Sequence, residues 1–218
     1  MGDVSGRCVK IPAGPVILEG DLTMPENAGG VILFAHGSGS SRHSPRNRFV
    51  AKTLNERRFA TLLMDLLTQE EERIDAQTAH LRFDIPLLAG RLVAASEWLA
   101  HNPDTRTLAL GYFGASTGAA AALIAAAERP GSTRAVVSRG GRPDLAGAAL
   151  GRVRAPVLLI VGGADTTVIQ MNRSALAELN GESKLQIIRH ATHLFEEPGA
   201  LEEAARLAGE WFEEHIIE

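Results

Sequence analysis

The feature that most constrains the fold is the alternation of short apolar runs with stretches of helical periodicity. The runs have strand length, and several are rich in Val, Ile and Leu: VILFAHG (31–37), TLLMDL (61–66), TLALGYFG (107–114), RAVVSRGG (134–141), PVLLIVGGAD (156–165) and KLQIIRH (184–190). Runs that are apolar throughout are typical of parallel strands covered by helices on both faces. The alternation therefore predicts an α/β fold, an open and mostly parallel sheet in a three-layer α/β/α sandwich.

The remaining segments predict an early strand and several helices. VILEGDLTMP (16–25) indicates a strand or hairpin, with Gly20 and Asp21 as a possible turn. Ser44 followed by Pro45 predicts a capped helix that runs to about residue 58. Two later helices show an apolar face, with Leu88, Leu92, Ala95 and Leu99 after Asp84-Ile85-Pro86, and with Leu201, Ala204, Ala208, Trp211 and Phe212 near the end.

Length and charge limit the class of protein. A chain of 218 residues without repeats or linkers predicts a single domain, 1–218. A net charge of -4 gives no general attraction to nucleic acid or to anionic membranes, so neither is expected as a partner. Cys8 is the only cysteine and cannot form an internal disulfide. Because no apolar signal segment or membrane-length run is present, we expect a cytoplasmic protein, either a monomer or a homodimer.

Polar residues follow the predicted strands, where ligands bind in open α/β sheets. Among them a serine (Ser116), an acid (Asp165) and a histidine (His193) occur in that chain order. A serine hydroxyl needs an adjacent base to become a nucleophile, and the base needs a group that orients it. These three residues are therefore the first candidates for a catalytic site.

The motifs around these residues resemble those of the α/β-hydrolase superfamily. Gly114-Ala115-Ser116-Thr117-Gly118 is similar to the G-x-S-x-G nucleophile elbow, and His36-Gly37 to the oxyanion loop. Asp165 matches the acid after the penultimate long strand, and His193 in HATHLFEEP (190–198) matches the histidine loop before the final helix. The resemblance covers nearly the whole chain and is strongest to the small, lidless dienelactone hydrolase-like branch. One departure is Ser116, since dienelactone hydrolases proper have cysteine there, so a lactone substrate does not follow from the resemblance.

The resemblance implies a serine hydrolase that acts on a small ester, thioester or lactone without cofactor or metal. Ser116 would be the nucleophile, His193 the general base and Asp165 the orienting acid. The backbone N–H of Thr117 and a donor from Ser38 would form the oxyanion hole. Two alternatives remain: an acyltransferase with the same three residues, and a non-catalytic binding module in which they do not meet.

Each assignment also has a structural alternative. Ser116 could cap the helix that follows it, and Asp144 is a rival to Asp165 as the acid. His190 and His193 have a spacing that could suit a metal pair, but no cysteine or clear carboxylate accompanies them, so a structural role is expected for His190.

Arginines near the predicted site could hold an anionic part of a substrate. Arg42, Arg46 and Arg48 follow the presumed oxyanion loop, and Arg139 and Arg142 follow a strand at the same edge of the sheet. We take Arg42, Arg139 and Arg142, together with His36, as candidate substrate-binding residues. The alternatives are a turn-shaping role for His36 and, for the arginines, a hydrated surface with acidic partners such as Glu70, Glu71, Glu72 and Asp144.

Overall fold

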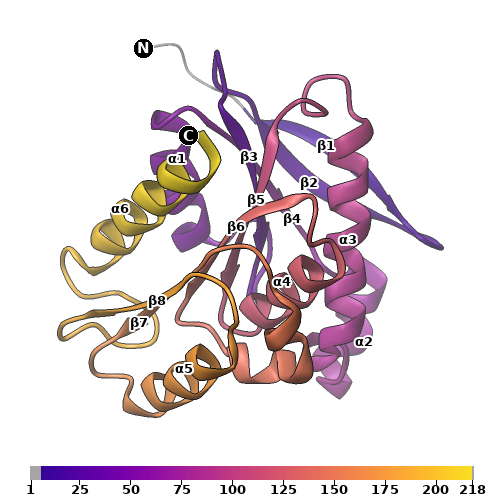
Figure 1. Ribbon diagram of the computed structural model, residues 1–218. Coiled ribbons are helices and arrows are strands. Elements are labelled where there is room, and N and C mark those ends of the chain that lie inside the picture. The colour runs from indigo at the N-terminus through magenta and orange to yellow at the C-terminus, as the bar shows by residue number, and fades with distance from the viewer. Residues whose placement is uncertain (1–5, 218) are drawn as a thin grey trace.

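An eight-stranded sheet runs through the middle of the molecule, with helices on both of its faces (Figure 1). The computed structural model describes residues 6–217. The strand order is β1-β2-β4-β3-β5-β6-β7-β8, in which the β1–β2 and β2–β4 pairs are antiparallel and the others parallel. The strands are β1 (Arg7–Ala13), β2 (Val16–Thr23), β3 (Gly30–Ala35), β4 (Phe59–Met64), β5 (Ala109–Ala115), β6 (Thr133–Arg139), β7 (Val157–Gly162) and β8 (Ser183–Ile188). The predicted mostly parallel, three-layer architecture is confirmed.

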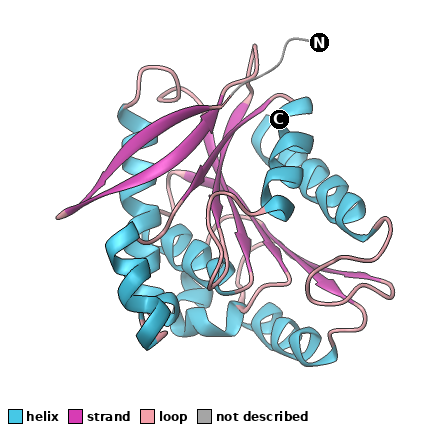
Figure 2. Ribbon diagram, turned by 180° about the vertical axis from the view of Figure 1, so that it is seen from behind, coloured by secondary structure: helices cyan, strands magenta, loops and turns pink. Residues whose placement is uncertain are grey.

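The helices form two layers, which Figure 2 shows from behind. Helices α1 (Pro45–Glu56) and α6 (Ala200–Phe212) pack together on one face. The other face carries α3 (Ile85–His101), α4 (Thr117–Glu128), the 3-10 segment η2 (Pro143–Arg152) and α5 (Thr166–Glu178), with α2 (Gln69–Thr78) and the short η1 (Leu81–Phe83) beside α3. A short π-helical turn, η3 (Glu213–Ile217), follows α6.

Alternate residues of each central strand point to the two helix layers, as the period of a strand requires. On β3, Ile32 and Phe34 belong to the core under α1 and α6, whereas Val31, Leu33 and Ala35 belong to the core under α3 and α4. All six β3 residues are buried. This two-sided burial is the reason for the continuous apolar runs in the sequence.

The predicted helix starts are also confirmed. The Ser44 hydroxyl accepts a hydrogen bond from the Asn47 N–H at 3.3 Å and caps α1, which ends at Glu56. The Asp84 carboxylate accepts one from the Leu87 N–H at 3.0 Å and caps α3. Such caps satisfy N–H groups that have no partner within the helix.

The N-terminal hairpin differs from the expectation. Strand β2 continues through Gly20 and Asp21, and the turn lies at Gly14, whose φ is +64°. A Cβ at position 20 would lie 2.9 Å from Leu62 Cδ1 and 3.3 Å from the Leu63 carbonyl oxygen, both on β4. Gly20 therefore lets two strands approach each other, and the prediction of a turn at that point was wrong.

The connection between β6 and β7 contains only η2, so no cap domain is inserted there. Within residues 6–217, no helix combines the length and the apolar character needed to cross a bilayer.

Candidate active site

Ser116 lies at a sharp turn between the end of β5 and the start of α4. Its φ of +51° and ψ of -124° are unusual for a residue with a side chain. Ser116 occupies the N-cap position of α4, but its side chain makes no capping hydrogen bond. The hydroxyl is therefore not used to cap the helix, and the strained backbone leaves it available at the edge of the sheet.

The two glycines of the motif allow the turn to form. A Cβ atom on Gly114 would lie 2.4 Å from the Ala119 Cα, and one on Gly118 would lie 2.3 Å from the Ala35 carbonyl oxygen. Both contacts are with backbone, which cannot move aside as a flexible side chain would. Glycine at these two positions therefore brings α4 against β3 and β5 directly behind Ser116.

His193 and Asp165 meet at the same edge of the sheet. His193 Nδ1 lies 2.7 Å from Asp165 Oδ2, and the other carboxylate oxygen accepts from the Val168 N–H at the start of α5, at 3.4 Å. A carboxylate partner places the hydrogen of neutral imidazole on Nδ1, so Nε2 carries the lone pair. Asp165 therefore holds the ring in the form in which Nε2 can accept a proton.

Ser116 and His193 line one cavity of about 230 Å³. Within residues 6–217, no hydrogen bond joins the Ser116 hydroxyl to the His193 ring. Such bonds are often long or poorly aligned in unliganded enzymes and tighten when substrate binds. The structure thus brings His193 and Asp165 into contact and places Ser116 in the same cavity without a direct bond.

The loop after β3 lies against the elbow. A Cβ on Gly37 would be 3.0 Å from the Ser116 Cβ, so this glycine permits the close approach. The Ser38 N–H donates to the Thr117 hydroxyl at 2.9 Å, and the two hydroxyl groups are 3.2 Å apart. Ser38 and Thr117 are therefore neighbours, as an oxyanion hole requires, and the Ser38 amide donates to the Thr117 hydroxyl.

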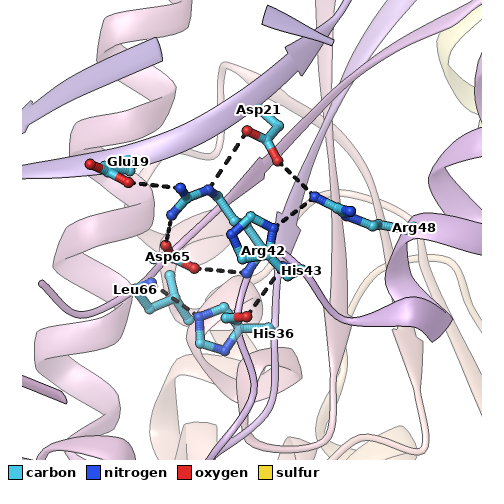
Figure 3. Close-up of polar contacts among 9 residues, drawn as sticks. Glu19, Asp21, His36, Arg42, His43, Arg48, Asp65 and Leu66 are labelled. Carbon is cyan, nitrogen blue, oxygen red and sulfur yellow. Dashed lines mark hydrogen bonds and ion pairs between the residues drawn. The ribbon is translucent and has the colours of Figure 1, made fainter. Parts of the chain in front are cut away.

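His36 shapes this loop and also lines a cavity of about 510 Å³ beside it. Its Nε2 accepts from the Leu66 N–H at 3.1 Å (Figure 3). Its Nδ1 donates to the Gly37 carbonyl at 2.9 Å. Burial lowers the pKa of His36, which the Gly37 carbonyl and the Asp65 charge only partly oppose. The ring stays neutral, and both of its nitrogens hold the loop after β3 to the loop after β4.

Arg42 is also occupied, contrary to the expectation that it faces a substrate. Its guanidinium pairs with Asp65, with Glu19 at 2.7 Å and with Asp21 at 3.6 Å, and its backbone N–H donates to Asp65 at 2.7 Å (Figure 3). Burial lowers the pKa of Arg42, but the three carboxylates outweigh it and raise the pKa overall. Arg42 therefore ties the loop after β3 to β2 and to the end of β4.

This network predicts a role for Arg42 in stability. Arg42→Gln is expected to lower the free energy of unfolding by about 1–3 kcal/mol, because Glu19 and Asp65 would lose their cation and Asp21 would keep only the exposed Arg48. Arg129→Gln is the matched control, since its pair with Glu97 is more exposed and is expected to contribute less than about 1 kcal/mol. Urea unfolding of both variants measures the difference, and equal losses would refute the anchoring role.

Arg142 and Asp144, two further candidates, bind each other. Arg142 Nη2 lies 2.7 Å from Asp144 Oδ2, and the Arg142 Nε makes a second bond to the same carboxylate. The Arg142 guanidinium, which was expected to face a substrate, is thus bound to Asp144. Asp144 is the acid that the sequence offered as the alternative to Asp165. The backbone N–H of Arg142 donates to the Ser116 carbonyl at 3.0 Å, which supports the elbow instead.

Arg139 differs from the other arginines because it is buried without a carboxylate partner. It lines the cavity of Ser116 and is 7% exposed. Its Nη2 donates to the Asn47 side chain at 3.2 Å, whereas Nε and Nη1 have no hydrogen-bond partner within residues 6–217. Its Cζ lies 6.0 Å and 5.7 Å from the ring centres of Phe113 and Phe195. Asn47 and Phe195 carry no sequence motif, so their roles here could not be predicted.

Burial is the main influence on the charge of Arg139. It lowers the pKa of the guanidinium to about 10, and repulsion by Arg46 contributes to the shift. The group is still charged at neutral pH. A shift of this size corresponds to roughly 3 kcal/mol of unfavourable free energy, which the protein tolerates beside its candidate nucleophile.

A second, larger cavity of about 510 Å³ adjoins the first, and both are lined by Gly37, Ser38, Ser40 and Ser44. Glu72 and Asp75 also line the larger cavity, whereas Ser116 and His193 do not. Burial raises the pKa of Glu72, and the charges of Asp65 and Asp75 add to this. The candidate nucleophile, Ser116, and the candidate base, His193, therefore line the smaller cavity. The larger cavity adjoins it beside the loop after β3.

Comparisons with known proteins agree with this arrangement at the level of the fold. A crystal structure of a dienelactone hydrolase from Anabaena variabilis is 62% identical, with a TM-score of 0.95, and the match covers 97% of this chain and 98% of that one. Est1E from Butyrivibrio proteoclasticus is 18% identical with a TM-score of 0.81, and the match covers 98% of this chain and all of that one. The second likeness shows the shared fold only.

Curated relatives come from two strains of Mycobacterium tuberculosis, where they bear the name "Putative phosphoribosyl transferase". Each is 58% identical over 208 residues, which is 95% of this chain but 46% of the relative. The chain thus spans less than half the length of these relatives. The profile of the dienelactone hydrolase family matches residues 18–215. By this match and by its likeness to the Anabaena protein, the chain belongs to the dienelactone hydrolase family.

Proposed function

We propose that the chain is a serine hydrolase that cleaves small carboxylic esters, thioesters or lactones through an acyl-enzyme on Ser116. The observation that carries the proposal is the strained backbone of Ser116 in the same cavity as His193, whose other ring nitrogen is bonded to Asp165. A nucleophile, a base and a group that orients the base are the minimum for this chemistry.

In the first half-reaction, the Ser116 Oγ attacks the carbonyl carbon while His193 Nε2 takes its proton. Asp165 stabilises the imidazolium that forms, and stays ionised itself. Collapse of the tetrahedral intermediate breaks the bond to the leaving group, which receives the proton from His193. The acyl group is then bonded to Ser116, and the ring is neutral again.

The negative oxygen of the intermediate would lie at the start of α4. Within residues 6–217, the Thr117 N–H has no hydrogen-bond partner, and we assign it as the first donor. The Ser38 N–H would exchange the Thr117 hydroxyl for the oxyanion. A hydrogen bond to a charged oxygen is roughly twice as strong as a neutral one, so this exchange favours the transition state.

In the second half-reaction, water attacks the acyl carbon and gives its proton to His193. The bond between the acyl carbon and Ser116 Oγ then breaks, His193 returns the proton to Oγ, and the acid is released. An alcohol or amine in place of water would make the chain an acyltransferase, with the same first half-reaction. We do not propose a phosphoribosyl transferase activity for this chain. The part of the chain that matches the Mycobacterium tuberculosis relatives is also the part that matches the dienelactone hydrolase family.

The proposal is tested by labelling with a fluorophosphonate probe and by turnover of a panel of p-nitrophenyl esters. We expect wild-type protein to take up one label on Ser116 and to cleave short activated esters. Ser116→Ala is the control and should do neither. Wild-type protein that is folded, yet neither labels nor cleaves any ester, would favour a binding module instead.

A further inference from the structure

The cavity of Ser116 contains a buried positive charge that the proposed chemistry does not use. Arg139 leaves two guanidinium nitrogens without acceptors, and within residues 6–217 no carboxylate lies within 4.0 Å of it. The other buried arginine, Arg91, pairs with Glu71 at 2.7 Å. Buried charges are normally paired, so the missing partner at Arg139 requires an explanation.

The surroundings of Arg139 add positive potential. Arg46 lines the same cavity, and its pair with Glu196 is long, at 3.5 Å, and exposed to solvent. The cavity is also lined by Ser44, Arg46 and Asn47 from the start of α1, whose first turn contains no acidic residue. At this end of α1, Pro45 has no N–H and the Asn47 N–H is bonded to the Ser44 hydroxyl, so the helix favours an anion mainly through its dipole. Two guanidinium groups and a helix N-terminus therefore converge on one small space.

We propose that the substrate carries a phosphate or phosphonate group, which Arg139 and Arg46 bind at the N-terminus of α1, next to the ester bond held at Ser116. A phosphate group has a charge of about -1.5 to -2 at neutral pH and three acceptor oxygens. This charge matches two arginines better than the single charge of a carboxylate does. The inference rests on the proposed function for the identity of the bond that is cleaved, but not for the binding of the anion.

The first test compares two p-nitrophenyl esters of the same shape. One has an acyl chain that ends in a phosphonate, and in the other a tert-butyl group replaces the phosphonate. Wild-type protein is expected to prefer the anionic ester in kcat/KM by about tenfold to a hundredfold, as for hydrogen bonds to a charged group. Arg139→Gln should reduce this ratio to about one, because kcat/KM falls more for the anionic ester than for the neutral one.

Two variants serve as comparison. Arg46 is partly exposed, so Arg46→Gln is expected to fold. This variant should lose part of the preference for the anionic ester. Arg142→Gln should retain it, because the Arg142 guanidinium is bound to Asp144. If the preference disappears with Arg142→Gln and survives in Arg139→Gln, the assignment of the anion site is wrong.

The second test measures binding without catalysis. In a Ser116→Ala background, a phosphonocarboxylic acid is expected to raise Tm with increasing concentration, and the further change Arg139→Gln should remove this effect. Glutarate, which has a carboxylate in place of the phosphonate, should raise Tm less. A larger effect of glutarate would assign the site to carboxylates and overturn the proposal.

The two tests also separate this proposal from the proposed function. If the protein cleaves no ester but the phosphonate raises Tm through Arg139, the hydrolase proposal fails and the anion site remains. If both esters are cleaved equally and the phosphonate leaves Tm unchanged, the anion site is refuted and the hydrolase proposal stands.

Discussion

Ser116→Ala is expected to lower kcat for any ester that the chain cleaves by about four to six orders of magnitude. Without the hydroxyl there is no acyl-enzyme, and only water held in the cavity could attack the substrate. The fold should not change, because the Ser116 side chain makes no capping hydrogen bond and its backbone contacts remain. Steady-state kinetics with an activated ester measure the loss, and circular dichroism checks the fold.

The companion variants show whether the three residues act as a unit. His193→Ala should cost about as much as Ser116→Ala, and the double variant little more, since the proton of Ser116 needs the ring as its acceptor. Asp165→Asn should cost less, though still roughly four orders of magnitude, because it allows the wrong tautomer of His193. Asp144→Asn is the matched control and should change kcat little. Losses that multiply in the Ser116 and His193 double variant would contradict a shared mechanism.

The central fold could be predicted because burial on both faces leaves a strong signal. Each parallel strand must be apolar along its whole length, and each helix needs only one apolar face. Strand β1 lacks this signal. It pairs with β2 at the edge of the sheet, and only Ile11 and Ala13 are buried among its residues. An edge strand of this kind is held by backbone hydrogen bonds, which carry no information about side chains.

The local structure around the candidate site was predictable where backbone geometry dictates the residue type. Gly114 and Gly118 are required by contacts with backbone, and Ser44 and Asp84 by helix ends, so each has a recognisable local pattern. The partners of the arginines were not predictable. Arg42 and Arg139 both lie near the edge where the strands end, yet one is surrounded by three carboxylates and the other by none.

Arg42 and Arg139 differ because their contacts come from segments that are distant in the sequence. The carboxylates around Arg42 lie on β2 and after β4, and they reach it because β2 joins the sheet beside β4. Arg139, at the end of β6, meets instead Asn47 of α1 and two aromatic rings. A sequence shows how many charges a chain has, but their pairing depends on which strands become neighbours.

Gly118→Ala is expected to lower the free energy of unfolding by about 3 kcal/mol or more, or to prevent folding. The added methyl group would lie 2.3 Å from the Ala35 carbonyl oxygen and 2.5 Å from that of His36. These backbone atoms lie at the end of β3 and at the start of the loop that follows it, so α4 must move away from the sheet to admit the methyl group. Any variant that folds would also displace the loop that carries Ser38, and should cleave esters far more slowly. Urea unfolding and ester turnover measure the two effects.

Gly90→Ala is the control that separates steric clash from helix propensity. Gly90 lies within α3, as Gly118 lies within α4, but a Cβ there would meet nothing within 4 Å. Alanine favours helix over glycine by about 0.5–1 kcal/mol, so Gly90→Ala should stabilise the protein by that amount. The same substitution in two helices is thus expected to have opposite signs. If Gly118→Ala were also neutral or stabilising, α4 would not lie as close to β3 as the elbow requires, and the placement of Ser116 would be wrong.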